Sequence, residues 1–457
     1  MKRSKKLCIL LGILIAVCLA ALAAMLSEEK KEEIKTSGET VLSVESAKVT
    51  ALCWEQGGTT WSFHRGDDGW QYDDDAEFPV SDSAMDALLE PFRSLSAAFT
   101  IENAEDLGRY GLDEPTCTIT LTTDDETYTV KLGDHSTMDS QRYMDIGDGN
   151  VYLAVSDPLD AYDVELEDLI ANDDVPYFDE VSQIRFAGSE DYSVIYDENG
   201  KSICADDIYF TADGKPLDTS RVNSYISVLR YLELTDYVTY KVTDEELSAY
   251  GLDDPDLSVS VDYTDDGTSD TFVLHISRDP AEKKSAADAE DEEASDITAY
   301  ARVGDSKIIY QISGSSYRSL MAAGYNDLRH QEIFSGDFDD VTGIDVTLDG
   351  ETYTLTSQKD SKERTWLCEE AEIEIGDLQD ALETLTAEEF TSEKAAGQQE
   401  ISLTLHLDHE DEPELTITLY RCDGSKCLAV VDGKSVAYVP RGEMVTLAEA
   451  VRAIALN

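Results

Sequence analysis

Positive charge is scarce in this sequence. It contains 35 lysine and arginine residues against 97 aspartate and glutamate residues, which gives a formal net charge of −62. Lys2, Arg3, Lys5 and Lys6 precede an apolar run, so the chain beyond that run is even more acidic. A surface this negative repels nucleic acid phosphates and anionic lipid head groups. We therefore expect no nucleic acid partner, and a surface suited to basic partners, to cations or simply to solubility.

The sequence also lacks the short motifs of common enzyme classes. It has no Gly-x-Ser-x-Gly elbow, phosphate-binding loop, His-Glu-x-x-His helix or dinucleotide-binding glycine pattern. Ser27 and Lys30 have a Ser-x-x-Lys spacing, but they lie in a charged stretch where no pocket would form. We predict no catalytic residue, no cofactor and no enzymatic activity.

Histidine is rare, with 6 residues in 457, and metal ligands are poorly grouped. His406 and His409 stand beside acidic residues, but residues three apart on a strand point to opposite faces. Runs such as Asp73–Asp75, Asp265–Asp266 and 288–293 could hold calcium, although none has the spacing of an EF-hand loop. We predict no metal-ligating residue, and calcium binding by acidic turns stays open.

Eight cysteines include no Cys-x-x-Cys pair, which argues against a metal knuckle or a thioredoxin-like site. Four isolated cysteines fall at expected strand positions: Cys53, Cys117, Cys204 and Cys368. Cys422 and Cys427 flank an expected tight turn, and a disulfide between them stays open because an extracytoplasmic location would permit it.

Residues 7–26 form the one long apolar run, with 20 uncharged residues. That length suffices for a helix to cross a bilayer. The bases before it predict a cytoplasmic N-terminus and an extracytoplasmic remainder. A removable signal peptide is the alternative, because Ala21-Leu22-Ala23 offers a small-residue cleavage site.

The rest of the chain repeats one pattern three times. Each copy has an apolar stripe at the spacing i, i+3, i+4, i+7, which predicts an amphipathic helix. The stripes are Met85, Leu88, Leu89 and Phe92; Val222, Tyr225, Ile226 and Leu229; and Leu378, Ala381, Leu382 and Leu385. Ser81 and Asp218 are the expected N-caps of the first two helices.

Strands of alternating polarity surround each expected helix, as in an antiparallel sheet. Opening hairpins are expected at 49–72, 181–209 and 341–367, with Trp61, Trp70 and Trp366 as core anchors. Later hairpin turns are expected at 147–150, 304–306 and 432–434, followed by Tyr152, Tyr310 and Tyr438 at equivalent places. Closing helices are expected near 159–169, 315–323 and 443–454.

A short signature stands between the stripe and the later strands in the first two copies. Its members are Tyr110, Gly111, Leu112, Asp113 and Pro115 in one copy, and Tyr250, Gly251, Leu252, Asp253 and Pro255 in the other. A glycine after a helical turn can take positive φ, the next leucine can pack back on the turn, and proline prevents further helix. We interpret the signature as a structural helix stop that needs no chemistry. The third copy has Ala395-Ala396-Gly397-Gln398-Gln399 there and is expected to be degenerate.

On this signature and the paired strands after it, the chain resembles the domain-of-unknown-function family 4340. The resemblance is good over 49–169 and 181–320 and weak over 341–457. It implies a bacterial protein, often with an N-terminal membrane anchor and often encoded beside the subunits of ATP-driven exporters. The family has no assigned activity, so the resemblance supplies no site residue.

Together these observations predict an α+β protein. We expect a basic segment at 1–6, a transmembrane helix at 7–26, a charged stalk at 27–46, and three tandem repeats at 47–175, 176–335 and 336–457. Each repeat would be an antiparallel sheet of hairpins with one or two packed helices. Residues 280–296 of the second repeat lack apolar periodicity and are expected to form a mobile acidic loop.

The expected function is that of a membrane-anchored, non-enzymatic binding or scaffold protein outside the cytoplasm. Its partners would be the membrane, through the N-terminal helix, and another envelope protein such as a transporter. Two alternatives stay open: a glycan or peptide hydrolase with carboxylates between domains, and an adhesin or spacer stabilised by calcium.

Overall fold

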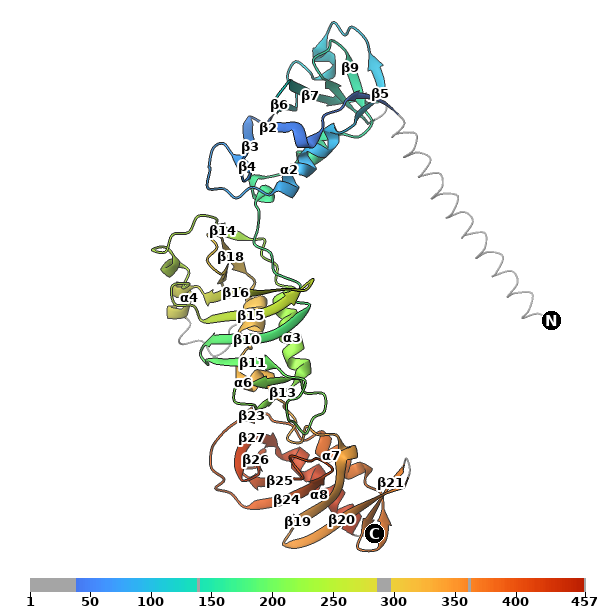
Figure 1. Cartoon of the computed structure of the whole chain (residues 1–457), viewed down its shortest axis with the longest axis vertical. Coiled ribbons are helices and arrows are strands. Elements are labelled where there is room, and N and C mark those ends of the chain that lie inside the picture. Colours follow the sequence, from blue (N-terminus) through green and yellow to red (C-terminus); the bar gives the residue numbers. More distant parts are fainter. Residues whose placement is uncertain (1–37, 138–139, 286–296, 361–362, 456–457) are drawn as a thin grey trace, which may run out of the picture. The chain divides into compact units, whose positions relative to one another are not determined.

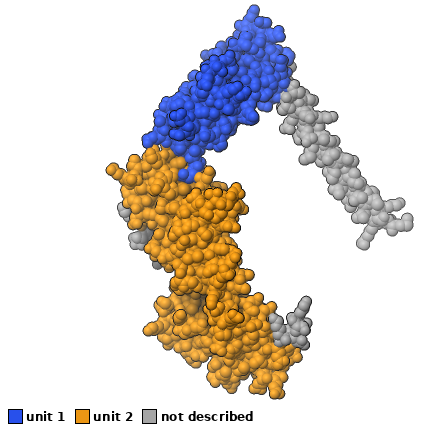
Figure 2. Space-filling model, viewed as in Figure 1, with its two compact units in different colours: residues 1–173 blue, residues 174–457 orange. Residues whose placement is uncertain are grey.

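The computed structural model describes residues 38–137, 140–285, 297–360 and 363–455. The chain divides into two compact units, residues 1–173 and 174–457 (Figure 2). Among the described residues, no helix is both long enough and apolar enough to cross a membrane. The apolar run at 7–26, for which we predicted such a helix, lies outside the described residues.

The first unit contains one sheet of nine antiparallel strands (Figure 1). The strands are β1 Glu39–Leu42, β2 Val49–Gln56, β3 Thr59–Gly66, β4 Gly69–Tyr72, β5 Leu95–Ile101, β6 Cys117–Thr123, β7 Thr127–His135, β8 Arg142–Asp145 and β9 Val151–Ala154. Their order in the sheet is β1-β5-β9-β8-β7-β6-β2-β3-β4.

The second unit contains two further sheets of nine antiparallel strands each. One consists of β10 Glu180–Gly188, β11 Tyr192–Tyr196, β12 Tyr209–Thr211, β13 Pro216–Leu217, β14 Tyr237–Thr239, β15 Leu257–Asp265, β16 Thr268–Arg278, β17 Ala299–Val303 and β18 Ile309–Ile312. The other consists of β19 Val341–Leu348, β20 Glu351–Asp360, β21 Glu363–Cys368, β22 Ala371–Ile373, β23 Glu389–Phe390, β24 Gln399–Leu407, β25 Glu414–Arg421, β26 Lys426–Val431 and β27 Lys434–Pro440.

All three sheets share one eight-stranded topology. The common order is β4-β3-β2-β6-β7-β8-β9-β5 in the first sheet, β12-β11-β10-β15-β16-β17-β18-β14 in the second, and β21-β20-β19-β24-β25-β26-β27-β23 in the third. The ninth strand differs: β1 lies beside β5, whereas β13 and β22 lie beside β12 and β21. Tandem antiparallel sheets, as predicted from the alternating strands, are therefore the architecture of the chain.

One helix also recurs in each copy, in the chain before the strand that ends the common order (β5, β14 or β23). These helices are α2 Asp82–Leu89, α3 Thr219–Arg230 and α7 Gly376–Glu383, and all twelve residues of the predicted stripes are buried. Ser81 caps α2 by accepting a hydrogen bond from the Ala84 N–H, and Asp218 caps α3 by accepting from Ser220 and Arg221. Because the stripe lies on one face at this spacing, the sequence alone was sufficient to place these helices.

The closing segments vary in length among the three copies. The first copy ends in two separate 3-10 turns, η4 Pro158–Ala161 and η5 Leu166–Leu169, so the closing helix predicted near 159–169 is wrong. The second ends in α5 Gly314–Met321 and α6 Tyr325–Leu328, and the third in α8 Arg441–Ala455. Shorter 3-10 turns complete the described elements: η1 Ser46–Lys48, η2 Glu90–Phe92, η3 Leu107–Tyr110, η6 Leu247–Ala249 and η9 Phe338–Asp340.

The predicted equivalence of three tyrosines is wrong for the third copy. In the sheet register Tyr152 lies opposite Met144 and Tyr310 opposite Ala301, whereas the corresponding place in the third copy, opposite Ala429, is taken by Ala437. Tyr438 is one residue further along, so its side chain points to the other face of the sheet. Its hydroxyl donates to Glu393 at 2.6 Å.

Trp61 is a weaker core anchor than predicted. Trp70 and Trp366 are buried, but Trp61 is only half-buried, and the fully buried indole of the first sheet is Trp54. Trp61 lies opposite Trp54 in the β2–β3 register and stacks on it with ring centroids 5.3 Å apart. It therefore covers the edge of the core that Trp54 fills.

Part of the predicted acidic loop is helical. Residues Pro280–Ser285 form α4, which begins where the Asp279 carboxylate accepts hydrogen bonds from the Ala281 and Glu282 N–H groups. Proline at the first helical position and an aspartate cap are strong start signals that outweigh the missing apolar stripe. Residues 286–296 of the predicted loop lie outside the described residues.

The second and third sheets are joined through the segment 329–338. Glu332 forms an isolated bridge with Thr386, and the flanking Ile333 N–H and Gln331 C=O bond to Leu385 and Ala387. Ile203, from the loop between β11 and β12, packs against the hydrophobic core of the third sheet. These contacts hold the segment 329–338 and the loop between β11 and β12 in place, together with the polar side chains that both carry.

Candidate functional site

The signature has the geometry of a helix stop in the first copy. The 3-10 turn η3 ends at Tyr110, and Gly111 comes next with φ of 68°. The Leu112 N–H bonds back to the Leu107 C=O at 3.1 Å, and the Leu112 side chain is fully buried. This is the backbone pattern of a Schellman motif, in which the glycine takes a left-handed conformation and the next residue packs on the turn.

The second copy repeats this geometry. Gly251 has φ of 72° after η6, and the Leu252 N–H bonds to the Leu247 C=O at 3.0 Å. A Cβ at Gly251 would lie 2.7 Å from Ser277 Oγ on β16, and one at Gly111 would lie 2.7 Å from Asp134 Cγ on β7. Both conformation and close approach to the neighbouring strand therefore require glycine.

A pair of tyrosines accompanies the signature, and one member was not predicted. Tyr110 contacts Tyr143 on β8 with ring centroids 4.9 Å apart, and Tyr250 contacts Tyr300 on β17 at 5.1 Å. The register places Leu428 at the corresponding position of the third copy, which also lacks the signature. The signature tyrosine is thus a packing residue, and the third copy, which lacks it, also lacks the partner tyrosine.

The remaining signature residues lie in the loop that enters the next strand. Asp113 and Asp253 are exposed, and the Asp113 carboxylate accepts a hydrogen bond from the Glu114 N–H at 3.0 Å. Pro115 and Pro255 are half-buried just before β6 and β15. The two copies belong to different units, and each is explained within its own sheet.

Behind the second signature lies a Lys–Ser contact that resembles a nucleophile and base. Lys283 Nζ on α4 is 3.0 Å from Ser277 Oγ and 2.5 Å from the Asp256 carboxylate. Ser277 is fully buried, so no substrate reaches its hydroxyl. The Lys283 ammonium instead closes an ion pair across the start of β15, and this group is structural.

A similar role belongs to the buried cation of the first unit. The Arg142 guanidinium contacts both Asp157 oxygens at 2.7 and 2.8 Å and donates to the Gly133 C=O at 2.6 Å. Its remaining nitrogen lies 2.8 Å from His135. Each of the three guanidinium nitrogens therefore has a partner within the protein, and the group is explained by its structural role.

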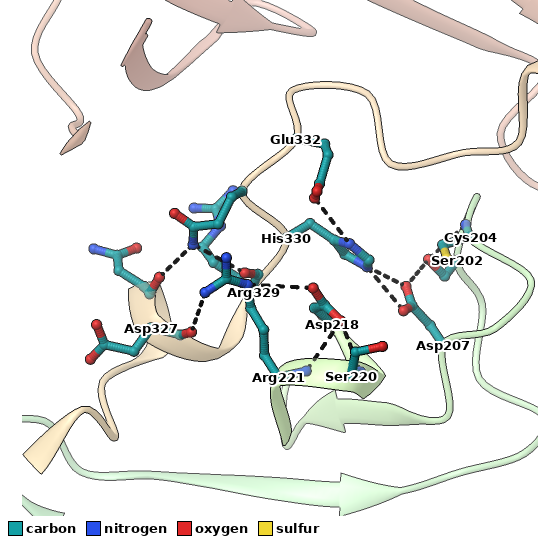
Figure 3. A network of polar contacts seen from close by, with 12 residues as sticks. Ser202, Cys204, Asp207, Asp218, Ser220, Arg221, Asp327, Arg329, His330 and Glu332 are labelled. Carbon is teal, nitrogen blue, oxygen red and sulfur yellow. Dashed lines mark hydrogen bonds and ion pairs between the residues drawn. The ribbon is translucent and has the colours of Figure 1, made fainter. Parts of the chain in front are cut away.

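A polar network in the second unit surrounds Asp207 and His330 (Figure 3). Its first segment is the loop between β11 and β12, which we expected to be strand at Cys204. The loop turns because Ser202 Oγ accepts from the Cys204 N–H at 3.1 Å and the Asp207 N–H bonds to the Cys204 C=O at 3.2 Å. Serine and aspartate favour such turns over a strand.

His330 joins this loop from a distant part of the sequence. It comes after α6, and its Nε2 lies 2.9 and 3.0 Å from the two carboxylate oxygens of Asp207. The Asp207 side chain is 1% exposed, and Ser202 Oγ donates to it at 2.6 Å. On the other side of the ring, His330 Nδ1 lies 3.8 Å from the Glu332 carboxylate.

Carboxylates determine the electrostatics of this network. Burial acts to lower the pKa of His330, but Asp207, Asp218 and Glu332 outweigh burial, and the His330 pKa is raised above its ordinary value. Burial also raises the pKa of the Cys204 thiol, with Asp207 and Asp206 adding to the effect.

The network is poorly arranged for nucleophilic catalysis. A thiol with a raised pKa carries little of the thiolate that attacks a substrate. Ser202 Oγ donates its hydrogen bond to Asp207. It does not donate to the His330 imidazole, which would have to act as its base. What the group does offer is one sulfur, one nitrogen and one carboxylate oxygen within 4.8 Å of one another.

The histidines singled out from the sequence have separate partners. His406 Nε2 contacts Asp345 at 2.9 Å and its Nδ1 contacts Glu414 at 3.3 Å, whereas His409 Nδ1 accepts from the Glu412 N–H. Each ring is accounted for by its own neighbours.

Of the acidic runs, one gathers a further carboxylate. Asp265 and Asp266 lie with Asp179, and burial followed by repulsion from Asp179 raises the pKa of Asp265. Asp73 pairs with His64 at 2.5 Å, and residues 288–293 lie outside the described residues. Cys422 and Cys427 both carry free thiols, and Arg421 is the residue opposite Cys427.

Comparison with known families adds one result. The model of the family described as "Domain of unknown function (DUF4340)" matches residues 70–255 and 209–403, which together span more than half of the chain. The chain belongs to this family. No curated protein and no solved structure matches it.

The family matches coincide with the repeat. They begin at Trp70 on β4 and at Tyr209 on β12, which occupy the same place in the common eight-stranded order. The match to DUF4340 therefore starts at equivalent strands of the first two sheets and reaches into the third, as far as β24.

Proposed function

We propose that this DUF4340 protein is a non-enzymatic binding or scaffold component of a bacterial cell envelope. It would be anchored by a single N-terminal helix at residues 7–26, with the rest of the chain outside the cytoplasm. Its partner would be another envelope protein, for which the permease of an ATP-driven transporter is our candidate.

The observation that supports this proposal is the repetition of one packed sheet with no chemistry at its shared signature. Gly111 and Gly251 serve backbone geometry, and the tyrosine beside each serves packing. Repeated domains of this kind extend the surface that a chain offers to partners. The acidic composition favours a partner with a basic face.

Topology is tested with the one exposed cysteine among the described residues, Cys422. In spheroplasts, a membrane-impermeant maleimide should label the wild-type chain and should not label the Cys422→Ser variant. Labelling that appears only after lysis would place the third sheet in the cytoplasm and contradict the proposal.

The partner is tested by affinity isolation of the full chain from gently solubilised membranes. We expect a permease or another envelope protein to be recovered in a fixed ratio to the chain, and to be lost at high salt if acidic residues carry the contact. Recovery of the chain alone after cross-linking in cells would contradict a scaffold role.

A further inference from the structure

We propose that Cys204, Asp207 and His330 bind one divalent cation of the zinc(II) class. Each residue contributes one ligand atom, and the three atoms lie within 4.8 Å of one another. Figure 3 shows the three side chains converging from the loop between β11 and β12 and from the segment after α6. This inference stands independently of the proposed function.

The donor set identifies the class of cation. A thiol sulfur and an imidazole nitrogen are soft or borderline ligands that suit zinc and its neighbours, and one carboxylate oxygen is common beside them. Calcium and magnesium prefer oxygen ligands alone. A zinc site with three protein ligands completes its tetrahedron with water or another exogenous ligand.

The spacing of the donors is close to what a tetrahedral cation needs. Bond lengths to zinc of about 2.0–2.3 Å place neighbouring donors roughly 3.3–3.6 Å apart. The Asp207 oxygens lie 2.9 and 3.0 Å from His330 Nε2. The ligating oxygen and Nε2 would therefore have to separate by a few tenths of an ångström. The Cys204 sulfur would move inward, and a side-chain rotation in a half-buried turn permits that.

Surrounding contacts already orient two of the ligands. The Glu332 carboxylate lies 3.8 Å from His330 Nδ1, where it would accept the Nδ1 proton once the cation replaces the proton that Nε2 donates to Asp207. Ser202 Oγ donates to Asp207 Oδ2 and so fixes the second carboxylate oxygen. A carboxylate behind a ligating imidazole is a recurrent partner in zinc sites.

Binding exchanges protons for the cation. The cation replaces the proton of the Cys204 thiol and any proton on His330 Nε2, and both protons pass to solvent. The bound cation would connect the loop that carries Ile203 to the segment that carries Glu332, and both segments contact the third sheet. It should therefore stabilise the junction between the second and third sheets.

The test uses the purified full chain, stripped with chelator and titrated with zinc(II) or cobalt(II). We expect one cation per chain, a thiolate-to-cobalt charge-transfer band, and a melting temperature that rises with zinc concentration. Cys204→Ser should abolish the band, and Glu332→Gln should weaken binding by about 10–100-fold. Cys368→Ser, which removes a half-buried thiol of β21, is the matched control and should bind like the wild type.

Any one of three results would overturn the inference. One is wild-type chain that takes up no stoichiometric zinc in equilibrium dialysis, a measurement that needs no variant to fold. Another is a cobalt band that survives in Cys204→Ser with near-ultraviolet circular dichroism like that of the wild type. Retained binding in His330→Gln with unchanged affinity would likewise exclude the proposed ligand set.

Discussion

One cross-strand pair of an acid and a base occurs at the same register in the second and third sheets, but with the two residue types exchanged between the strands. Arg185 on β10 pairs with Asp262 on β15, with nitrogen to oxygen distances of 2.5 and 2.7 Å. At the matching register of the third sheet, Asp345 on β19 contacts His406 on β24 at 2.9 Å. The acid and the base have changed strands, so the cross-strand pair is retained with its polarity reversed.

This pair predicts a pH dependence of stability. The Arg185 hydrogen bond holds the pKa of Asp262 below its ordinary value, since it outweighs the opposing effect of burial. A carboxyl whose pKa is lower in the folded than in the unfolded chain stabilises the fold above its unfolded pKa of about 3.9. That contribution is lost as the pH falls through the still lower folded pKa.

Asp262→Asn should therefore be less stable than the wild type at neutral pH, and the difference should shrink toward zero in acid. The measurement is the urea midpoint of both chains across this pH range. Asp254→Asn, which changes an exposed loop aspartate, is the control and should behave like the wild type throughout. A difference between Asp262→Asn and wild type that stayed constant into acid would argue against the ion pair as its source.

At this scale the sequence predicted the positive φ of two glycines but not the network around His330. The glycines stand within a contiguous signature whose residue types explain one another. Asp207 and His330 are 123 positions apart in sequence and obey no period, so only folding reveals their contact. Tyr143 and Tyr300 were missed for the same reason.

Among the elements, the stop between η3 and β6 has a specific sequence requirement. Gly111 combines positive φ with a Cβ position 2.7 Å from Asp134 Cγ. A non-glycine residue in this conformation costs on the order of 1–3 kcal/mol, and the collision with β7 adds to that. We expect Gly111→Ala to lower the free energy of unfolding of the first unit by at least this much.

The matched control is Gly147→Ala in the same unit. Gly147 also has positive φ, at 87°, but nothing lies within 4 Å of the Cβ position. Denaturant unfolding should therefore show a smaller loss for Gly147→Ala than for Gly111→Ala. Equal losses would mean that conformation alone, and not the approach to β7, imposes the glycine.

Elements defined by periodicity were predictable, and those defined by capping alone were not. The stripe of α3 and the alternation along β24 each repeat a burial pattern over several residues. By contrast, α4 has six residues and begins at Pro280 behind an aspartate cap, with no stripe to reveal it. The slip at Tyr438 also escaped prediction, because a single irregularity in the β26–β27 register moves a side chain to the other face.

In the molecule as a whole, the three copies share a fold but do not all have the same signature and groups of side chains. The third sheet has lost the signature and its tyrosine pair, yet keeps the eight-stranded order and the helix stripe. The Cys204–Asp207–His330 group involves the segment that leads into the third sheet, so its place depends on the junction between the second and third copies. Function in this family is therefore better sought at junctions and surfaces than in the shared motif.

The division into two compact units predicts two unfolding transitions, and the tryptophans report them separately. Trp54, Trp61 and Trp70 belong to the first unit and Trp366 to the second. In Trp366→Phe, the remaining fluorescence should trace a single urea transition, that of the first unit, since compact units with their own cores unfold cooperatively. In this background, Gly111→Ala should shift the transition to lower urea, whereas Gly251→Ala, the same change in the second unit, should leave it in place. A shift of similar size from both glycine variants would mean that the two units unfold as one.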